Sequence, residues 1–227
     1  MNLITTIKLC QTLPNVFVGS ENEDSIQKSQ VWLSDIEFHK GDYYLVEAES
    51  GTGKSSLCAY IYGNRRDFKG KILFNDRDIR TFSIDEWCDI RRRHLAYLPQ
   101  EMKLFGELTA LENIEIKNRL TGYFTEKKIL EMLDRLEIGH KANVPASRLS
   151  VGQQQRVAIV RALAQPFDFI LLDEPVSHLD ERNNRIVTSL ISEEARHNNA
   201  GVITTSVGNP LLLRKLNQTT SLSSIKL

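Results

Sequence analysis

The fold of this chain is decided by the stretch Tyr43-Tyr44-Leu45-Val46-Glu47-Ala48-Glu49-Ser50-Gly51-Thr52-Gly53-Lys54-Ser55-Ser56. Its first five residues form a mainly apolar and aromatic run, which predicts a buried strand. A helix is expected from Ser56 to Tyr62, ending near Gly63. The glycine-rich turn between strand and helix, with its Gly-Lys-Ser end, has the setting that a phosphate-binding loop requires.

Each residue type in this loop suits phosphate binding. Gly51 and Gly53 allow the backbone to turn its N–H groups toward phosphate oxygens, and the start of the helix adds a favourable dipole. Lys54 is expected to reach the β- and γ-phosphates, and Ser55 to offer its hydroxyl to Mg²⁺. The residues expected to bind the nucleotide here are Ala48, Glu49, Ser50, Gly51, Thr52, Gly53, Lys54, Ser55 and Ser56.

A second motif, Phe167-Asp168-Phe169-Ile170-Leu171-Leu172-Asp173-Glu174, delivers two adjacent acids at the end of an apolar strand. Ligands of open α/β sheets bind at this end of the strands. Asp173 is expected to orient water on Mg²⁺, because hard cations prefer oxygen ligands, and Glu174 to polarise the attacking water. The alternative is that two acids simply end a strand at the surface, and the phosphate loop upstream argues against it.

A third motif, Leu149-Ser150-Val151-Gly152-Gln153-Gln154-Gln155-Arg156, stands at the start of a helix predicted over 153–165. The free N–H groups at such a helix start suit an anion. With these three motifs the chain resembles the ATP-binding cassette (ABC) family, whose signature is Leu-Ser-Gly-Gly-Gln. The resemblance covers nearly the whole chain and is strongest to the ATPases of the lipoprotein-release, macrolide-export and cell-division group.

The resemblance implies roles for two further loops. Tyr97-Leu98-Pro99-Gln100 is similar to the family's glutamine loop, so Gln100 is expected to ligate Mg²⁺ and to sense the γ-phosphate. Ser177-His178-Leu179-Asp180 is similar to the loop that crosses the dimer, with Asp180 as its key acid.

The resemblance also implies a second cassette. In the family, two cassettes enclose two ATP molecules head to tail, so Ser150, Gly152 and Gln153 of one chain are expected to face the nucleotide held by Lys54 of the other. The adenine stacks on an aromatic residue upstream of the phosphate loop, for which Phe17 is the candidate. An ordinary core phenylalanine is the alternative for Phe17, because its spacing to Lys54 is longer than expected.

Three residues depart from the family pattern. Ala48 replaces the first glycine of the phosphate loop, and Val151 replaces the first glycine of the signature pair. After the predicted strand 201–205, Ser206 stands where the family has a switch histidine that touches the γ-phosphate. Losing a hydrogen bond to a charged group costs about 1.5–3 kcal/mol. The sequence therefore predicts a slow ATPase, about ten- to a hundredfold slower if the whole loss falls on the transition state.

The remaining pattern predicts an α/β protein. Further strands are predicted at 71–74, 95–98, 167–172 and 201–205, and helices at 85–93, 126–136 and 182–196. Strands that alternate with helices imply a mainly parallel sheet. We expect one domain over residues 1–227: an α/β P-loop NTPase core of the ABC ATPase type, at about 1–100 and 150–227, with an inserted helical subdomain at about 101–149.

Composition excludes several classes of protein. With 41% hydrophobic and 26% charged residues, the 227-residue chain is globular rather than disordered. Its 29 basic and 29 acidic residues cancel, which argues against a nucleic-acid partner bound through bulk charge. The basic run Arg91-Arg92-Arg93-His94 is interpreted as a solvated helix face. No apolar run approaches the roughly 18 residues of a membrane helix, so membrane contact is expected only through a partner.

The implied function is that of the ATP-binding and ATP-hydrolysing subunit of a membrane ABC transporter, with ATP and Mg²⁺ as cofactors. The implied partners are a membrane permease and a second cassette, identical or related, and the implied location is cytoplasmic, at the inner face of the cell membrane. Two alternatives stay open. One is an ATPase that signals to cell-envelope enzymes through a membrane partner. The other, favoured by Ser206, is a nucleotide-gated binding module with little turnover.

Overall fold

The computed structural model describes residues 3–19, 26, 28–47, 49, 51–213 and 222–227. Its strands are β1 Thr6–Pro14, β2 Asp35–His39, β3 Tyr43–Glu47, β4 Phe68–Phe74, β5 Arg77–Asp78, β6 Leu95–Leu98, β7 Phe169–Asp173, β8 Gly201–Ser206 and β9 Leu222–Lys226. Its α-helices are α2 Lys54–Ile61, α3 Ile84–Arg93, α4 Ala110–Asn118, α5 Glu126–Arg135, α6 Val151–Leu163 and α7 Glu181–His197. In the described part of the chain, no helix combines the length and apolarity needed to cross a membrane.

The strands form two sheets. Five of them pair in the order β6-β7-β8-β3-β9, and each pairing is parallel. The predicted α/β architecture with a parallel sheet is therefore present. The other four pair antiparallel in the order β2-β1-β4-β5. The sequence did not predict this second sheet, because β1 is interrupted by a register shift between Cys10 and Leu13 and lacks a clean alternation.

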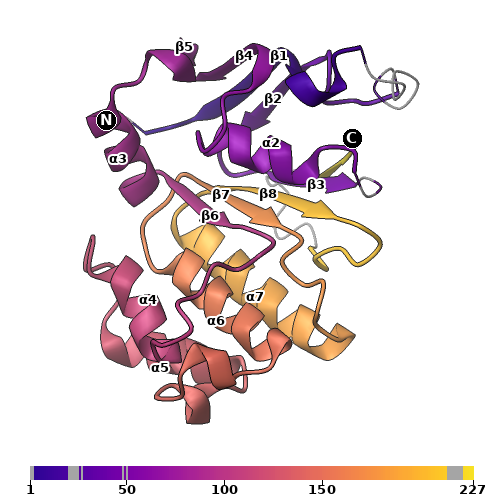
Figure 1. Ribbon diagram of the computed structural model, residues 1–227. Helices are drawn as coiled ribbons and strands as arrows, with labels where there is room; N and C mark the ends of the chain where they lie inside the picture. Colours follow the sequence, from indigo (N-terminus) through magenta and orange to yellow (C-terminus); the bar gives the residue numbers. More distant parts are fainter. Residues whose placement is uncertain (1–2, 20–25, 27, 48, 50, 214–221) are drawn as a thin grey trace.

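The two faces of the parallel sheet carry different layers. Helix α2 lies between the two sheets, whereas α6 and α7 cover the opposite face (Figure 1). Successive side chains of β7 point alternately into the two layers. Phe169 and Leu171 belong to the hydrophobic cluster that includes α2 and β1, while Ile170 and Leu172 belong to the cluster that includes α6 and α7. A strand buried on both faces reads as one continuous apolar run, as this one does.

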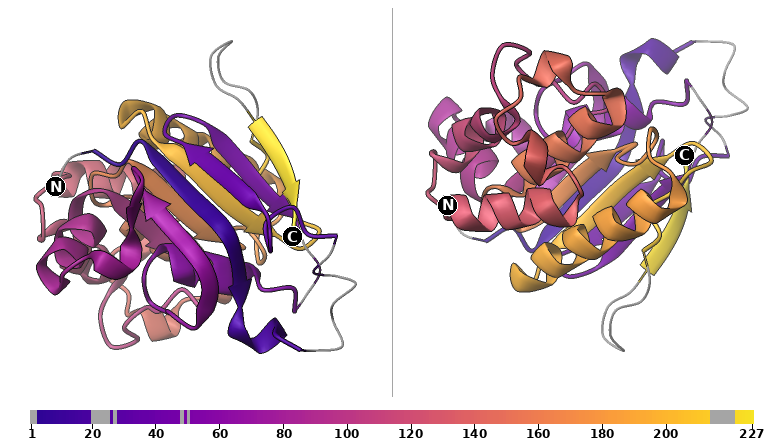
Figure 2. Two further views of the ribbon diagram at one scale, coloured as in Figure 1. Left: turned by 90° about the horizontal axis from the view of Figure 1, so that it is seen from above. Right: turned by 90° about the horizontal axis from the view of Figure 1, so that it is seen from below.

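Helices α4 and α5 pack beside α6 at one end of the molecule (Figure 2). Each begins at a threonine: Thr109 forms a capping box with Glu112, and Thr125 accepts a hydrogen bond from the N–H of Lys128. Their buried side chains, such as Ile114 and Leu133, share the hydrophobic cluster of α6 and α7. The division into a core and a helical subdomain at about 101–149 stays a prediction.

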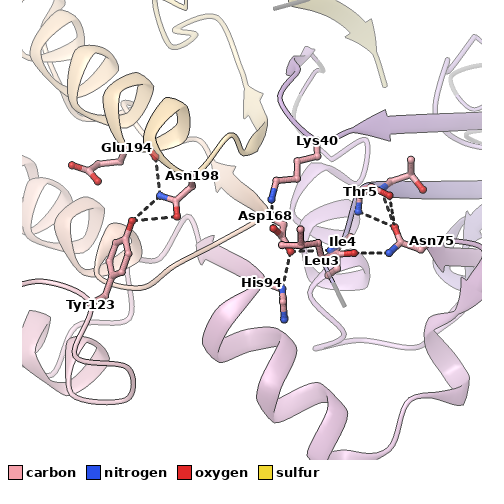
Figure 3. A network of polar contacts seen from close by, with 11 residues as sticks. Leu3, Ile4, Thr5, Lys40, Asn75, His94, Tyr123, Asp168, Glu194 and Asn198 are labelled. Carbon is pink, nitrogen blue, oxygen red and sulfur yellow. Dashed lines mark hydrogen bonds and ion pairs between the residues drawn. The ribbon is translucent and has the colours of Figure 1, made fainter. Parts of the chain in front are cut away.

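A buried polar network links the two sheets (Figure 3). Asp168, directly before β7, is 3% exposed. Its Oδ2 accepts hydrogen bonds from the N–H of Ile4 at 2.8 Å and from Nδ1 of His94 at 2.7 Å, and Oδ1 pairs with the ammonium of Lys40. Burial raises the pKa of Asp168, but these three hydrogen bonds outweigh it and hold the pKa below its usual value.

The prediction of a solvated helix face at residues 91–94 is wrong for both ends of that run. The Arg91 guanidinium lies over the rings of Trp87 and Tyr62, and it donates to the carbonyls of Tyr62 and Gly63. His94 is buried beside Asp168. The sequence pattern of this run is that of a solvated helix face, but the segment after α2 packs against Arg91 and the residue before β7 packs against His94.

Candidate functional site

The predicted phosphate-binding loop ends at a backbone conformation that favours glycine. Gly53 has a φ of 100° and precedes the first residue of α2, Lys54. A Cβ on Gly53 would lie 3.0 Å from the Trp32 ring and 3.1 Å from the Phe17 ring, so a side chain is also disfavoured by space. Gly51 likewise has a positive φ, of 84°. Two other residues predicted to bind the phosphates, Ala48 and Ser50, lie outside the described residues.

Lys54 and Glu174 face each other although they are far apart in sequence. Lys54 is 5% exposed, and its Nζ donates to the carbonyl of Glu49 at 2.7 Å and lies 4.0 Å from Oε1 of Glu174. Burial lowers the pKa of Lys54, and the charges of Glu174 and Asp173 oppose that change. The structure therefore brings the predicted phosphate ligand and the predicted catalytic acid together.

The three residues predicted to hold Mg²⁺ line one cavity. Ser55, Gln100 and Asp173 all border a space of about 660 Å³, and the Ser55 hydroxyl lies 3.4 Å from Oε1 of Gln100. A hydroxyl, an amide carbonyl and a carboxylate are all hard oxygen donors. Among the described residues no cluster of three or more His, Cys, Asp or Glu forms a metal cage. One carboxylate with neutral oxygens fits Mg²⁺, which keeps waters and is shared with phosphates.

The two acids at the end of β7 are held by residues that the sequence analysis missed. The hydroxyl of Thr205 donates to Oδ1 of Asp173 at 2.7 Å and accepts from the N–H of Glu174 at 3.2 Å. The carbonyl of Glu174 accepts from Nε2 of Gln155 at 3.2 Å. Thr205 and Gln155 come from β8 and α6. The only local signal was a threonine at the end of the strand predicted at 201–205.

Phe17 and Trp32 support the loop from behind. Both rings are buried, at 9% and 2% exposure, and both approach Gly53. The indole N–H of Trp32 donates to the carbonyl of Thr52 at 2.9 Å. Phe17 therefore has little ring surface to offer to an adenine, which favours the core alternative for this residue. Trp32 is a further contact that sequence reasoning missed.

The signature motif caps helix α6 and points outward. The helix begins at Val151, two residues before the predicted start, and Ser150 is its N-cap. The Ser150 hydroxyl accepts from the N–H of Gln153 at 3.3 Å, while the Gln153 side chain accepts from the N–H of Ser150 at 3.0 Å. Val151 is 49% exposed. At Gly152 a Cβ would lie 3.2 Å from the carbonyl of His178.

Asp180 and Ser206 take different positions. Asp180 is exposed and caps α7, and its Oδ1 accepts from the backbone N–H of Asn183 at 2.8 Å. That hydrogen bond is the main reason why the pKa of Asp180 lies below its usual value.

Ser206 is the last residue of β8 and is 4% exposed. Its Oγ has no hydrogen-bond partner within the described residues.

The cavity lined by the three predicted metal ligands also has two cationic residues in its wall. Lys117 and Arg161 line it, and within the described residues neither forms an ion pair with a carboxylate. Lys117 donates to the carbonyl of Arg91 at 3.1 Å, and Arg161 donates to the carbonyls of Met102 and Lys103. Burial, with the charges of Arg161 and Arg91, lowers the pKa of Lys117 to about 8.

A family model described as "ABC transporter" matches residues 34–177. The chain is 33% identical over 161 residues to the cell division ATP-binding protein FtsE of Bacillus subtilis, with 70% of each chain covered. It is 34% identical over 161 residues to the lipoprotein-releasing system ATP-binding protein LolD of Buchnera aphidicola, again with 70% of each covered. To the macrolide export ATP-binding/permease protein MacB of Pasteurella multocida it is 35% identical, over 69% of this chain and 24% of MacB.

Solved structures show the same fold. The dimeric structure of MJ0796, a bacterial ABC transporter cassette, superposes with a TM-score of 0.76 at 24% identity, covering 97% of this chain and 94% of that one. A dimeric post-hydrolysis state of MJ0796 bound to ADP and Pi gives a TM-score of 0.72 at 26% identity, covering 89% and 88%. The predicted fold class and the predicted group of relatives are both confirmed. This chain belongs to the ABC transporter family and is an ATP-binding cassette with the α/β P-loop fold, similar to the ATPases of the cell-division, lipoprotein-release and macrolide-export group.

Proposed function

We propose that this chain is the Mg²⁺-dependent ATPase subunit of a membrane transport system and that it acts on a separate permease. The proposal is carried by two neighbouring arrangements: Lys54 lies 4.0 Å from Glu174, and the residues that follow Lys54 and precede Glu174, Ser55 and Asp173, line one cavity with Gln100. The oxygen donors of that cavity would hold Mg²⁺, which neutralises charge on the β- and γ-phosphates when it is bound.

The side chains then have separate tasks. Lys54 binds the β- and γ-phosphates, and the loop N–H groups from Gly51 to Ser56 cradle their oxygens. Glu174 accepts a hydrogen bond from the attacking water and polarises it. Gln100 reports whether the γ-phosphate is present, because it lies beside Ser55 and starts the segment that leads to α4.

A second cassette would complete the site. Ser150, Val151 and Asp180 are exposed at helix starts, where free N–H groups and side chains can meet a ligand held by another chain. The similar structures of MJ0796 are described as dimeric. We propose the same head-to-tail arrangement here, with Ser150, Gly152 and Gln153 of one chain facing the phosphates bound by the other.

The permease is proposed to dock at the cavity beside Gln100. Ile116 of α4 lines this cavity and is 45% exposed, and Phe105 and Leu120, which flank α4 in the sequence, are 53% and 54% exposed. Lys117 and Arg161, which form no ion pair with a carboxylate within the described residues, add cationic groups to these apolar contacts. This docking would keep the chain at the cytoplasmic face of the membrane. Signalling to cell-envelope enzymes is the second form of the same proposal, supported by the similarity to FtsE.

Slow turnover is the proposed consequence of Ser206. Its buried hydroxyl ends β8, where the family has a longer and chargeable histidine. A nucleotide-gated module with little hydrolysis is therefore the second candidate function, and Ser206 is the observation that favours it.

Steady-state hydrolysis of Mg-ATP by the purified chain tests these proposals, with Glu174→Gln and Ser206→His measured beside the wild type and EDTA as the metal-free control. We expect slow, EDTA-sensitive hydrolysis that Glu174→Gln abolishes, and a gain of about tenfold in Ser206→His. Tight ATP binding without turnover in all three proteins would favour the gated module. Hydrolysis that survives Glu174→Gln would contradict the catalytic assignment.

A further inference from the structure

Three hydroxyl-bearing residues end β8, and they have different environments. Thr204, Thr205 and Ser206 are all buried, at 0%, 0% and 4% exposure. Within the described residues the hydroxyls of Thr204 and Ser206 have no hydrogen-bond partner. Because side chains alternate along a strand, these two point to one face of the sheet and Thr205 to the other. Only the Thr205 hydroxyl of these three bonds to the acids of β7.

The Thr205 hydroxyl uses both of its capacities on neighbouring groups. It donates a hydrogen bond to Oδ1 of Asp173 at 2.7 Å and accepts one from the N–H of Glu174 at 3.2 Å. The parallel pairing of β7 and β8 sets Asp173 directly opposite Thr205, which fixes these distances through the sheet. One hydroxyl therefore links the proposed metal ligand to the proposed catalytic acid.

Glu174 needs such support because its backbone is strained. Its φ is 50°, in the left-handed region that residues with a Cβ disfavour. The Thr205 hydroxyl accepts a hydrogen bond from the N–H of Glu174, and Nε2 of Gln155 donates one to the Glu174 carbonyl at 3.2 Å. Strained backbone persists where surrounding groups fix it, and such places cluster at active sites.

We propose that Thr205 is a positioning residue for the proposed metal ligand Asp173 and the proposed catalytic acid Glu174. Its hydroxyl turns the Asp173 carboxylate toward the metal position and holds the Glu174 backbone in the conformation that aims its side chain at the space near Lys54. This inference rests on the proposed function, since it gives Asp173 and Glu174 their roles. Groups that orient metal ligands typically change metal affinity or activity by about 10–100-fold when they are removed.

The test compares the same substitution at adjacent positions of β8. Thr205→Val removes both hydrogen bonds at nearly constant shape, and Thr205→Ser retains the hydroxyl. Thr204→Val removes a buried hydroxyl that has no hydrogen-bond partner among the described residues. Two quantities are measured in each protein: the turnover of Mg-ATP, and the Mg²⁺ concentration that half-saturates the enhancement of ATP binding, followed with a fluorescent ATP analogue. Urea unfolding provides the stability control.

We expect Thr205→Val to lower kcat by about 10–100-fold and to raise the half-saturating Mg²⁺ concentration. Thr204→Val should match the wild type in both, and Thr205→Ser should recover most of the loss. Equal behaviour of Thr205→Val and Thr204→Val would overturn the inference. If the valine variant does not fold, Thr205→Ala against Thr204→Ala makes the same comparison.

The binding measurement separates this inference from the proposed function. If the wild type binds Mg-ATP but does not hydrolyse it, the ATPase proposal fails, and a shifted Mg²⁺ midpoint confined to Thr205→Val still supports the inference. If ATP binding by the wild type does not respond to Mg²⁺, both are overturned.

Discussion

One aspartate directly precedes strand β7 and another is its last residue, and their surroundings differ. Asp168 stands before its first residue and receives a backbone N–H, an imidazole and an ammonium. Asp173 is its last residue and, within the described residues, forms one side-chain hydrogen bond, to Thr205. Both are nearly inaccessible, at 3% and 1% exposure. Both carboxylate oxygens of Asp168 have hydrogen-bonding or charged partners. The Asp173 carboxylate borders a cavity, and it can still accept hydrogen bonds or bind a cation there.

The difference shows how to separate a structural from a functional acid. A buried carboxylate that is paired and hydrogen-bonded belongs to the fold, because its removal leaves buried partners unmatched. A buried carboxylate with few partners beside a cavity costs stability unless a ligand supplies the missing charge. On the proposed assignment, the Asp173 carboxylate stabilises the state with a bound cation, whereas the Asp168 carboxylate stabilises the folded chain.

The largest expected effect comes from Asp173→Asn. The amide oxygen still accepts the Thr205 hydroxyl, so the free energy of unfolding should stay close to that of the wild type. Mg-ATP turnover should fall about a thousandfold, equivalent to about 4 kcal/mol of transition-state stabilisation. Steady-state ATPase assays and urea unfolding measure the two quantities. A variant that loses stability but keeps its turnover would break the comparison.

The same change at the other end, Asp168→Asn, should act on folding instead. It leaves Lys40 and His94 without their carboxylate, which should lower the free energy of unfolding by about 3 kcal/mol. The turnover of the folded protein should be unchanged. Urea midpoints, with ATPase assays at a temperature where the variant is folded, check this. A large fall in turnover with unchanged stability would show that Asp168 also belongs to the site.

Lowering the pH should remove part of the contribution that Asp168 makes to the free energy of unfolding. The pKa of Asp168 is lower in the folded protein than in an unfolded chain, where it lies near 3.9. Its contribution is therefore complete above about pH 5 and is lost as the pH falls through the folded value. Between pH 5 and pH 3 the wild type should lose stability faster than Asp168→Asn does. Parallel pH profiles of the two urea midpoints would contradict this.

The smallest effect is expected behind the phosphate loop. Trp32→Phe removes the indole donor to the Thr52 carbonyl and should weaken ATP binding by about 1 kcal/mol, or roughly fivefold. Trp87→Phe is the matched control, because the Trp87 indole nitrogen is buried without a partner within the described residues. Calorimetric titration with ATP compares them. Equal losses in both variants would mean that ring packing, not the hydrogen bond, supports the loop.

Much of the candidate site could be predicted from the sequence alone. The phosphate loop, the apolar strand that ends in Asp173-Glu174 and the signature before α6 are each contiguous, so their residue types and spacing carry the whole signal. The α/β class followed for the same reason, since periodicity is a local property. Element boundaries were close, and α6 differed by two residues because Ser150 proved to be its N-cap.

Tertiary structure decided everything that depends on distant residues meeting. Thr205 reaches Glu174 only because β7 and β8 pair in register, and Gln155 only because α6 covers the same sheet. Nothing near His94 in the sequence announces Asp168, 74 positions away, so the run at 91–94 was misread as solvated. Motifs name the groups that act on a ligand, whereas packing between separate elements chooses the groups that hold them in place.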